Sequence, residues 1–300
     1  IWQPILREKA DIFIFLGDNI YSDTSYPLVL QNNYKKLLSN KNFQTLRSQT
    51  KVFAIWDDHD YGKNDAGREY SIKKASQKAF AAAFELQKKL GQRKGTYQSY
   101  LLGPPGKKVH LVLLDTRYFR SKPSSYFWGL DWFLGKKPNW DTKATVLGEK
   151  QWLWLQKELQ KKADLRIVAS SIQLIPDKHK YEKWANFPLE RQKLLRLLQN
   201  NPARQTIVLS GDRHHSELSV WPSPSEALLY ELTASPLNQT STFPHREYNP
   251  YRIYHLYSGA NYGKIEINWQ PRTRVFLSIH DVKGRIVFRH GLQLESKKNQ

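Results

Sequence analysis

Five short apolar segments along the chain each end in a cluster of polar residues. Each is rich in Ile, Val, Leu and Phe, which predicts a buried strand with polar residues after its carboxyl end. The stretches between them predict helices over residues 71–90, 149–163 and 190–199. Strands that alternate with helices indicate an α/β fold, in which ligands collect beyond the carboxyl ends of the strands. The five strand segments are residues 11–19, 51–60, 109–117, 165–173 and 205–215.

The alternation of predicted strands and helices ends after Ser219. Residues 226–236 and 263–269 predict further strands, and residues 273–295 predict a hairpin that turns at Lys283 and Gly284. These strands favour a second, more antiparallel sheet. Two sheets face to face with helices outside them fit one continuous domain over residues 1–300.

Composition supports a folded, water-soluble chain. Of the 300 residues, 40% are hydrophobic and 13% aromatic, enough for a sizeable core. No apolar stretch approaches the roughly 18 residues that a transmembrane helix needs. Cys is absent, which excludes disulfides, thiolate ligands and a Cys nucleophile. The first ten residues predict an amphipathic helix without a cap, so we expect an N-terminal segment to be missing. A mature protein cut at a processing site is the alternative.

The net charge of +20 favours polyanionic partners. The Lys and Arg residues are spread through the predicted helices, which is typical of a solvated basic surface. Anionic polymers that bind this surface are therefore candidate partners. A band of basic residues dedicated to nucleic-acid binding is the less favoured interpretation.

Three of the predicted strand ends carry residues suited to chemistry. The segment GDNIY supplies Asp18 and Tyr21, WDDHD supplies Asp58 and His59, and SGDRHHS supplies Asp212 and His214. Each cluster alone has an ordinary explanation, because Asp after a strand is often a helix cap. Three such clusters, each after an apolar run in one α/β sheet, favour a shared site at one edge of that sheet.

Charge decides what such a site would contain. Carboxylates crowded at strand ends raise one another's pKa and destabilise the fold unless cations lie among them. Basic side chains could supply the charge, but they would leave the neutral His residues without a role. A metal pair uses both residue types, and the excess of oxygen ligands favours Fe, Mn, Ca or Mg over an all-His zinc site.

The ordered set GDNIY, WDDHDYGKND, LDTRYFR, SSIQ and GDRHHS resembles the PhoD-like alkaline phosphatase/phosphodiesterase family. This family is a branch of the calcineurin-like metallophosphoesterases and is related to the purple acid phosphatases. The resemblance implies a four-layer sandwich, with two mixed β-sheets flanked by helices. It also implies a dinuclear centre of two or more divalent or trivalent ions, Fe and Ca first, with Mn, Mg and Zn as alternatives.

The same resemblance implies roles for individual residues. Asp18 matches the Asp that bridges the two metals, Tyr21 a Tyr that ligates ferric iron, and Asp58 a ligand of the second metal. His59 matches the acid that assists phosphoryl transfer. Asp212 and His214 match two further ligands, with Asp212 as an oxygen replacement for His.

Two features depart from the superfamily pattern. The opening ligand motif, which lies on a strand before the position of Asp18, has no counterpart here. We therefore expect the chain to lack the first strand of this fold. The His expected near the end of the fourth strand segment is replaced by Ser170, Ser171 and Gln173.

The sequence thus predicts a metal-dependent phosphoric ester hydrolase that uses metal-activated water. Arg117 and Asn64 are candidate substrate-binding residues. An ion pair with Asp115 is the alternative for Arg117, and for Asn64 the alternatives are a turn, which its context favours, and a metal ligand. The rival functions are a nuclease or phospholipid phosphodiesterase on the same scaffold, and a catalytically impaired polyanion-binding protein. The resemblance implies a periplasmic or extracellular location.

Overall fold

The computed structural model describes residues 1–126, 130, 134–222, 228–237, 239–240 and 247–294. Its helices are α1 (Trp2–Arg7), α2 (Pro27–Ser39), α3 (Lys41–Gln49), α4 (Asp58–Tyr61), α5 (Lys73–Ala83), α6 (Gln87–Leu90), α8 (Gly148–Leu159) and α9 (Pro188–Gln199), with a 3₁₀ turn at Trp184–Asn186. Its strands are β1 (Ile12–Leu16), β2 (Lys51–Ile55), β3 (Gln98–Leu102), β4 (Val109–Leu113), β5 (Leu165–Ser170), β6 (Gln205–Ser210), β7 (Ser216–Trp221), β8 (Leu229–Ala234), β9 (Asn261–Asn268), β10 (Arg274–Asp281) and β11 (Ile286–Gln293). No helix in these ranges is long and apolar enough to cross a membrane.

The described strands form three sheets. The largest has six strands in the order β3-β4-β5-β6-β8-β7, the second pairs β1 with β2, and the third has the order β11-β10-β9. The four central strands of the large sheet run parallel, while β3 and β7 join its two edges antiparallel. The α/β class with mixed strand directions and flanking helices is confirmed.

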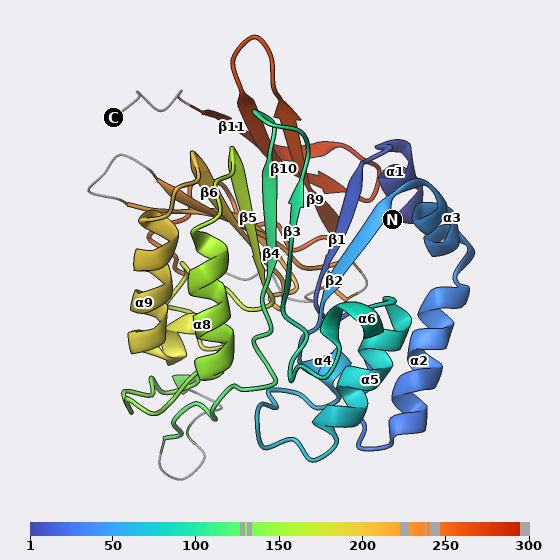
Figure 1. Ribbon diagram of the computed structural model, residues 1–300, viewed down its shortest axis with the longest axis vertical. Coiled ribbons are helices and arrows are strands. Elements are labelled where there is room, and N and C mark those ends of the chain that lie inside the picture. The colour runs from blue at the N-terminus through green and yellow to red at the C-terminus, as the bar shows by residue number, and fades with distance from the viewer. Residues whose placement is uncertain (127–129, 131–133, 223–227, 238, 241–246, 295–300) are drawn as a thin grey trace.

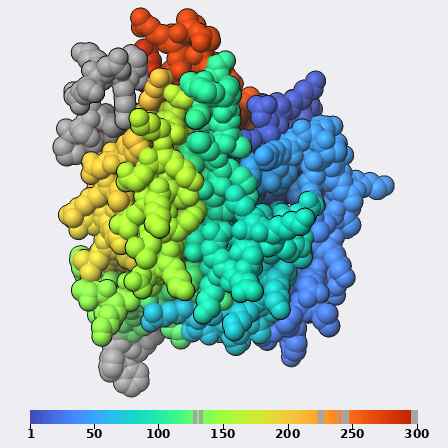
Figure 2. Space-filling model, in the orientation of Figure 1, coloured from blue at the N-terminus to red at the C-terminus, as the bar shows by residue number. Residues whose placement is uncertain are grey.

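The sheets and helices stack in layers (Figure 1). Helices α8 and α9 cover one face of the six-stranded sheet, and the other face packs on β2, β10 and β11. Helices α1, α2, α3 and α5 cover the outer side of β1 and β2. Figure 2 shows α8 and α9, in green and yellow, closing their side of the molecule, with the N-terminal segments in blue beyond β3 and β4.

Burial explains why the central strands are continuously apolar. Every residue of β5 is buried, because one face of the strand meets α8 and α9 and the other meets the second layer. Parallel strands covered on both faces typically lack the alternation of polar and apolar residues seen in exposed sheets.

One strand prediction was wrong in its placement. We expected residues 226–236 to belong to the second, antiparallel sheet, but β8 pairs parallel to β6 in the large sheet. Residues 226 and 227 lie outside the described residues. The predicted second sheet is also not continuous. In the part of the chain described, β1-β2 and β9-β10-β11 are two separate sheets that face the six-stranded sheet.

The helix predicted over residues 71–90 is broken. Helix α5 ends at Ala83, Glu85 adopts a left-handed φ of 58°, and α6 begins at Gln87. The turn lets Leu86 and Leu90 reach the core beside Phe80. Burial of these side chains outweighs the helical propensity of the segment.

Among the described residues, five helices and strands were not predicted, namely α2, α3, α4, β3 and β7, nor was the 3₁₀ turn at Trp184–Asn186. Helix α2 carries a signal that could have revealed it, since Pro27 stands at its first turn and Leu30 and Tyr34 bury one face. The prediction of a single domain over residues 1–300 that lacks its first strand stays a prediction.

Candidate metal centre

Three strand ends meet between the two layers. Asp18 follows β1, Asp57 and Asp58 follow β2, and Asp212 follows β6. Ligand atoms of Asp18, Asp58 and His59 lie within 4.8 Å of one another, and so do those of Asp57, Asp58 and Asp212. The predicted convergence is confirmed for these carboxylates. The site lies at one end of two facing sheets, however, and not at the edge of a single sheet as expected.

The backbone at this site adopts unusual conformations. Asp18, Asp212 and His214 have left-handed φ angles of 52°, 64° and 53°. Non-glycine residues adopt such angles at a cost of about 1–3 kcal/mol each, and they do so most often at functional sites. Gly17 has a φ of 105°, and a Cβ there would lie 2.5 Å from Cβ of Asp57. Glycine therefore permits the ends of β1 and β2 to approach.

The carboxylates disfavour one another's charge. Burial, and then the Asp58 carboxylate, raises the pKa of Asp18 well above its ordinary value. Burial, and then Asp57, does the same to the pKa of Asp212. Burial opposes the charge of Asp58 as well, but Arg117 and His59 outweigh it and lower its pKa. Negative charge at Asp18 and Asp212 therefore needs a cation that the nearby side chains do not fully supply.

A basic side chain does neutralise part of the cluster, which corrects our expectation that metals alone would do so. Arg117 is fully buried, and its Nε donates to Oδ1 of Asp57 at 2.5 Å. Its Nη1 donates to Oε2 of Glu182 at 2.5 Å, and its Nη2 lies 4.0 Å from Asp58. The suggested alternative partner was wrong, because Asp115 accepts from the backbone N–H of Arg117 and not from its side chain.

The remaining oxygen atoms fit metal ions. Oδ2 of Asp57 is buried and has no hydrogen-bond partner among the described residues. Burial raises the pKa of Asp57 to about 7, with Arg117 opposing the rise. A buried acceptor without a donor is costly, and a cation bound beside it would remove that cost. The donors are mainly carboxylate oxygens, which hard cations prefer.

The aromatic and imidazole groups surround the carboxylates. The Tyr21 hydroxyl donates to Oδ2 of Asp18 at 3.4 Å and lies 3.0 Å from Nε2 of His214. Burial, and then Asp18, raises the pKa of Tyr21. Burial, and then His59, lowers the pKa of His214, which favours the neutral imidazole that can act as a ligand.

His59 lies against this group and is held by a residue that the sequence did not single out. Its Nδ1 lies 2.7 Å from Oδ2 of Asp23, and its ring centroid lies 4.4 Å from that of Tyr21. Asp23 lies in the loop between β1 and α2, two residues after Tyr21 of the GDNIY segment, but it belongs to none of the motifs that the sequence singled out.

Two other acidic residues join the site. Ligand atoms of Asp65, Glu182 and Asp58 lie within 4.8 Å of one another. The backbone N–H of Asp65 donates to Oδ2 of Asp58 at 2.7 Å. Asp65 stands in the quoted motif WDDHDYGKND, but Glu182 is far from all strand ends, and only the fold brings it here.

The two candidate substrate residues occupy different surroundings. Asn64 is exposed beside a cavity of about 670 Å³ that Lys63, Lys122 and Lys136 also line. Arg117 is buried among the carboxylates. Substrate binding by either residue stays a prediction.

The chain is similar to known proteins in sequence and in fold. A family model described as PhoD-like phosphatase matches residues 1–275. The chain is 21% identical over 267 residues to alkaline phosphatase D of Bacillus subtilis (strain 168), a similarity that covers 72% of this chain and 43% of that protein. The chain thus matches less than half the length of this relative.

Two solved structures share the fold. The structure of PhoD has a TM-score of 0.68 at 18% identity and covers 96% of this chain and 68% of that one. The structure of purple acid phosphatase PPD1 from yellow lupin (Lupinus luteus) seeds matches with a TM-score of 0.59 at 11% identity. The match covers 97% of this chain and 48% of that one. Since the family model spans most of the chain, the chain belongs to the PhoD-like phosphatase family.

Proposed function

We propose that this chain hydrolyses phosphoric esters with a pair of metal ions held by Asp18, Tyr21, Asp58, Asp212 and His214. The observation that carries the proposal is that Asp58 lies within 4.8 Å of candidate ligand atoms of Asp18 in one group and of Asp212 in another. Tyr21 and His214 are added as ligands because the Tyr21 hydroxyl contacts both Asp18 and His214. When bound, the ions would lower the pKa of a water molecule and hold the phosphate oxygens. The oxygen-rich ligand set supports Fe and Ca first, with Mn, Mg and Zn as alternatives.

His59 would be the catalytic acid. Its Nδ1 is engaged by Asp23, so Nε2 is the atom free to meet a substrate. A proton on Nε2 could pass to the leaving oxygen or stabilise charge on the phosphoryl group. Asp23 would act as a positioning residue, because it fixes the orientation and tautomer of the imidazole.

Arg117 and Glu182 would keep the ligands in place. The guanidinium neutralises Asp57, which lies next in sequence to the shared ligand Asp58. Rigid support of this kind holds a metal ligand in the geometry that its ion requires.

The cavity beside Asn64 would receive the rest of the substrate. Three lysines (Lys63, Lys122 and Lys136) and three acidic residues (Asp23, Asp65 and Glu69) line it, and the lysines would offer positive charge to a phosphoester. Oδ2 of Asp65 pairs with Lys136 at 2.8 Å, which links the cavity rim to the residue that contacts Asp58. The substrate class that fits is a phosphoester, either a monoester or a diester.

The test is hydrolysis after metal reconstitution. The chelated protein is reloaded with Fe, Ca, Mn, Mg or Zn and assayed on p-nitrophenyl phosphate and on its bis ester. We expect hydrolysis of at least one ester, lost on rechelation and in Asp58→Asn. If no metal restores hydrolysis to a protein that binds metal, the proposed activity is wrong.

A non-catalytic polyanion-binding function is the second candidate, favoured by the net charge of +20. It predicts binding to an anionic polymer that weakens with salt and survives chelation. Hydrolysis of a diester within nucleic acid or phospholipid would instead identify a nuclease or phospholipase activity. A periplasmic or extracellular location also remains a proposal, which fractionation of the native cells would test.

A further inference from the structure

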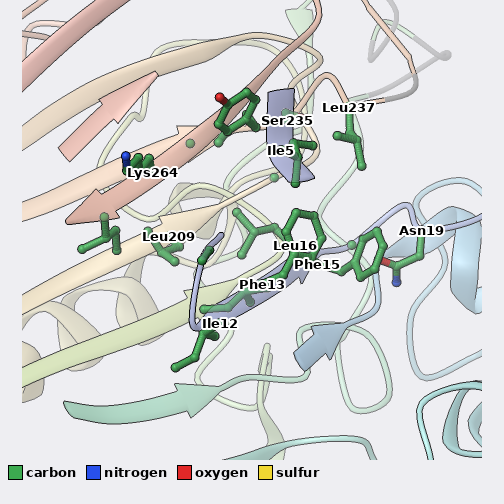
Figure 3. A pocket seen from close by; sticks show the side chains of 18 of the residues that line it. Ile5, Ile12, Phe13, Phe15, Leu16, Asn19, Leu209, Ser235, Leu237 and Lys264 are labelled. Carbon is green, nitrogen blue, oxygen red and sulfur yellow. The ribbon is translucent and has the colours of Figure 1, made fainter. Parts of the chain in front are cut away.

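Two features of the molecule lie outside the proposed chemistry. One is an apolar groove of about 730 Å³ that separates β1 from β9 (Figure 3). We already expect a further strand beside β1, and that expectation accounts for the groove. The other is a group of basic side chains formed by His179, Lys183 and Arg213, which we call the basic cluster. It has no role in the hydrolase function proposed above.

The basic cluster is assembled around Tyr181. The guanidinium carbon of Arg213 lies 4.2 Å from the centre of the Tyr181 ring, and the ring centroid of His179 lies 6.3 Å from it. Nζ of Lys183 donates to the carbonyl oxygen of Tyr181 at 3.0 Å. The three basic residues are only 4% to 7% exposed, whereas Tyr181 is exposed, so the cluster lies just beneath the surface.

His179 has a hydrogen-bonding capacity that the fold does not use. Both of its ring nitrogens are buried, and neither has a hydrogen-bond partner among the described residues. Burial, and then Arg213 and Lys183, lowers the pKa of His179 well below its ordinary value, so the ring is neutral at pH 7 and carries one N–H. A buried polar group without a partner costs free energy, and a ligand that accepts from it would remove that cost.

Lys183 is a buried cation without a close counter-ion. No carboxylate of the described residues lies within 4.0 Å of its Nζ. Asp177 and Glu247 are near enough to act on its charge, but each is engaged elsewhere. Glu247 accepts from Arg213 at 2.7 Å, and Asp177 lies 3.9 Å from Arg191. Burial, and then Arg213, lowers the pKa of Lys183 to about 8, which still leaves the amine mostly charged at pH 7.

The basic cluster therefore offers donors in excess of acceptors. Nε of Arg213 is buried and has no partner in the part of the chain described, although Nη2 of the same guanidinium pairs with Glu247. Lys183 keeps two further N–H groups, and His179 keeps its single N–H. Charged donors gathered without acceptors fit an oxyanion, just as the carboxylates of the metal centre fit cations.

Two chain segments place the basic cluster beside the metal centre. Lys183 follows Glu182, whose carboxylate accepts from Nη1 of Arg117 at 2.5 Å. Arg213 follows the proposed ligand Asp212 directly. Consecutive Cα atoms lie about 3.8 Å apart, so both donors belong to residues that border the centre. An anion held by the basic cluster would thus lie next to the ligand set and not within it.

We propose that His179, Lys183 and Arg213 bind a second phosphate group of the substrate, one that is not hydrolysed. The inference rests on the proposed hydrolase function, because it adds a subsite to the same centre. The substrate class that it specifies is a phosphoester that carries a further phosphate. A terminal phosphate has three acceptor oxygens, enough for all three residues, whereas a carboxylate has two.

The first test measures the binding of inorganic phosphate to the chelated chain by calorimetry, since chelation removes any phosphate held by metal ions. The parent chain should bind phosphate, and Lys183→Met should bind it at least about tenfold more weakly, as expected for the loss of a charge-assisted hydrogen bond. The matched control is Lys178→Met, which removes the same charge from an exposed position of the same segment. It should bind as the parent does. Equal binding by Lys183→Met and the parent, or no binding by the parent, would overturn the proposal.

Thermal unfolding separates a binding role of Lys183 from a structural one. Without phosphate, Lys183→Met should unfold at a temperature no lower than that of the parent, because the change removes a buried charge that lacks a close partner. Phosphate should raise the unfolding temperature of the parent and of Lys178→Met, but not that of Lys183→Met. His179→Phe fills a similar volume without an N–H and should respond less to phosphate than the parent. A full response in His179→Phe would contradict the assignment of that residue.

The substrate role is measured with two esters that differ by one phosphate: thymidine 5′-(p-nitrophenyl phosphate), and the same ester with a 3′-phosphate. For the metal-loaded parent we expect a KM at least about tenfold lower for the 3′-phosphorylated ester, and the two KM values should converge in Lys183→Met. Equal KM values in the parent would refute the second-phosphate role. If neither ester is hydrolysed while Lys183→Met still loses phosphate binding, the hydrolase proposal fails and the anion site stands.

Discussion

Arg117 and Asp57 form an ion pair with no exposure to solvent, and Nε of the guanidinium lies 2.5 Å from Oδ1 of the carboxylate. The pair lies inside the carboxylate cluster, where Asp58 follows Asp57 directly in the chain. Negative charge here is therefore offset in two ways: Arg117 neutralises Asp57, and under our proposal metal ions neutralise Asp18, Asp58 and Asp212.

Removal of Arg117 should destabilise the protein strongly. Arg117→Met leaves Asp57 without its cation and Glu182 with Arg120 alone, and breaking a buried pair in this way costs about 3–5 kcal/mol. Urea unfolding in the presence of chelator measures the change. Arg117→Met combined with Asp57→Asn should recover part of the loss, because the uncompensated charge is gone. A loss below about 1 kcal/mol, typical of an exposed pair, would contradict this assignment.

Loss of a carboxylate should have opposite effects with and without metal. Asp212→Asn removes one charge from the cluster, so we expect the chelated variant to unfold at a higher temperature than the chelated parent chain. Added Ca²⁺ or Mn²⁺ should raise the unfolding temperature of the parent more than that of the variant, since binding stabilises the folded state.

The control for this comparison is Asp11→Asn, because Asp11 is exposed and lies at the opposite end of β1 from Asp18. Its response to metal should equal that of the parent chain. Equal metal-induced shifts in Asp212→Asn and the parent would exclude Asp212 as a ligand.

His59 should affect turnover and not metal content. His59→Ala is expected to lower kcat by about 10²–10⁴-fold, the usual contribution of a general acid. Metal content measured by elemental analysis should stay unchanged. Asp23→Asn keeps the imidazole but weakens the contact that fixes the orientation of the ring, so kcat should fall less than in His59→Ala. Full activity in His59→Ala would refute the catalytic role.

Acid should destabilise the fold partly through His110, which lies away from the metal centre. Nε of Arg166 donates to its Nδ1 at 3.2 Å, and its Nε2 lies 3.2 Å from Oε2 of Glu158. Burial, and then Arg166, lowers the pKa of His110 to about 4. The unfolded chain, with a His pKa of about 6.5, therefore binds a proton before the folded protein does.

Stability from this group is thus complete above pH ~6.5 and falls as the pH drops toward about 4. His110→Gln keeps a donor and an acceptor but cannot titrate, so its free energy of unfolding should decline less over this range. His255→Gln, at an exposed position, should decline as the parent does. Parallel curves for His110→Gln and the parent would rule out the titration of His110 as a cause.

Local sequence was sufficient to predict most strands and the three carboxylates Asp18, Asp58 and Asp212 that meet at the centre. The apolar runs of β1, β2 and β6 are continuous because both of their faces are covered, and that pattern is visible without a structure. Asp18, Asp58 and Asp212 could then be brought together by one general rule, that chemistry collects beyond the carboxyl ends of strands.

Only the tertiary structure decided which charges are partners. Arg117 lies 60 residues from Asp57 and 65 from Glu182 in the chain, and no periodicity links such positions. The placement of β8 beside β6, and the groove between β1 and β9, likewise depend on how distant segments pack. Strand formation follows from neighbouring residues, whereas charge pairing and sheet order depend on contacts between residues far apart, which a single sequence does not specify.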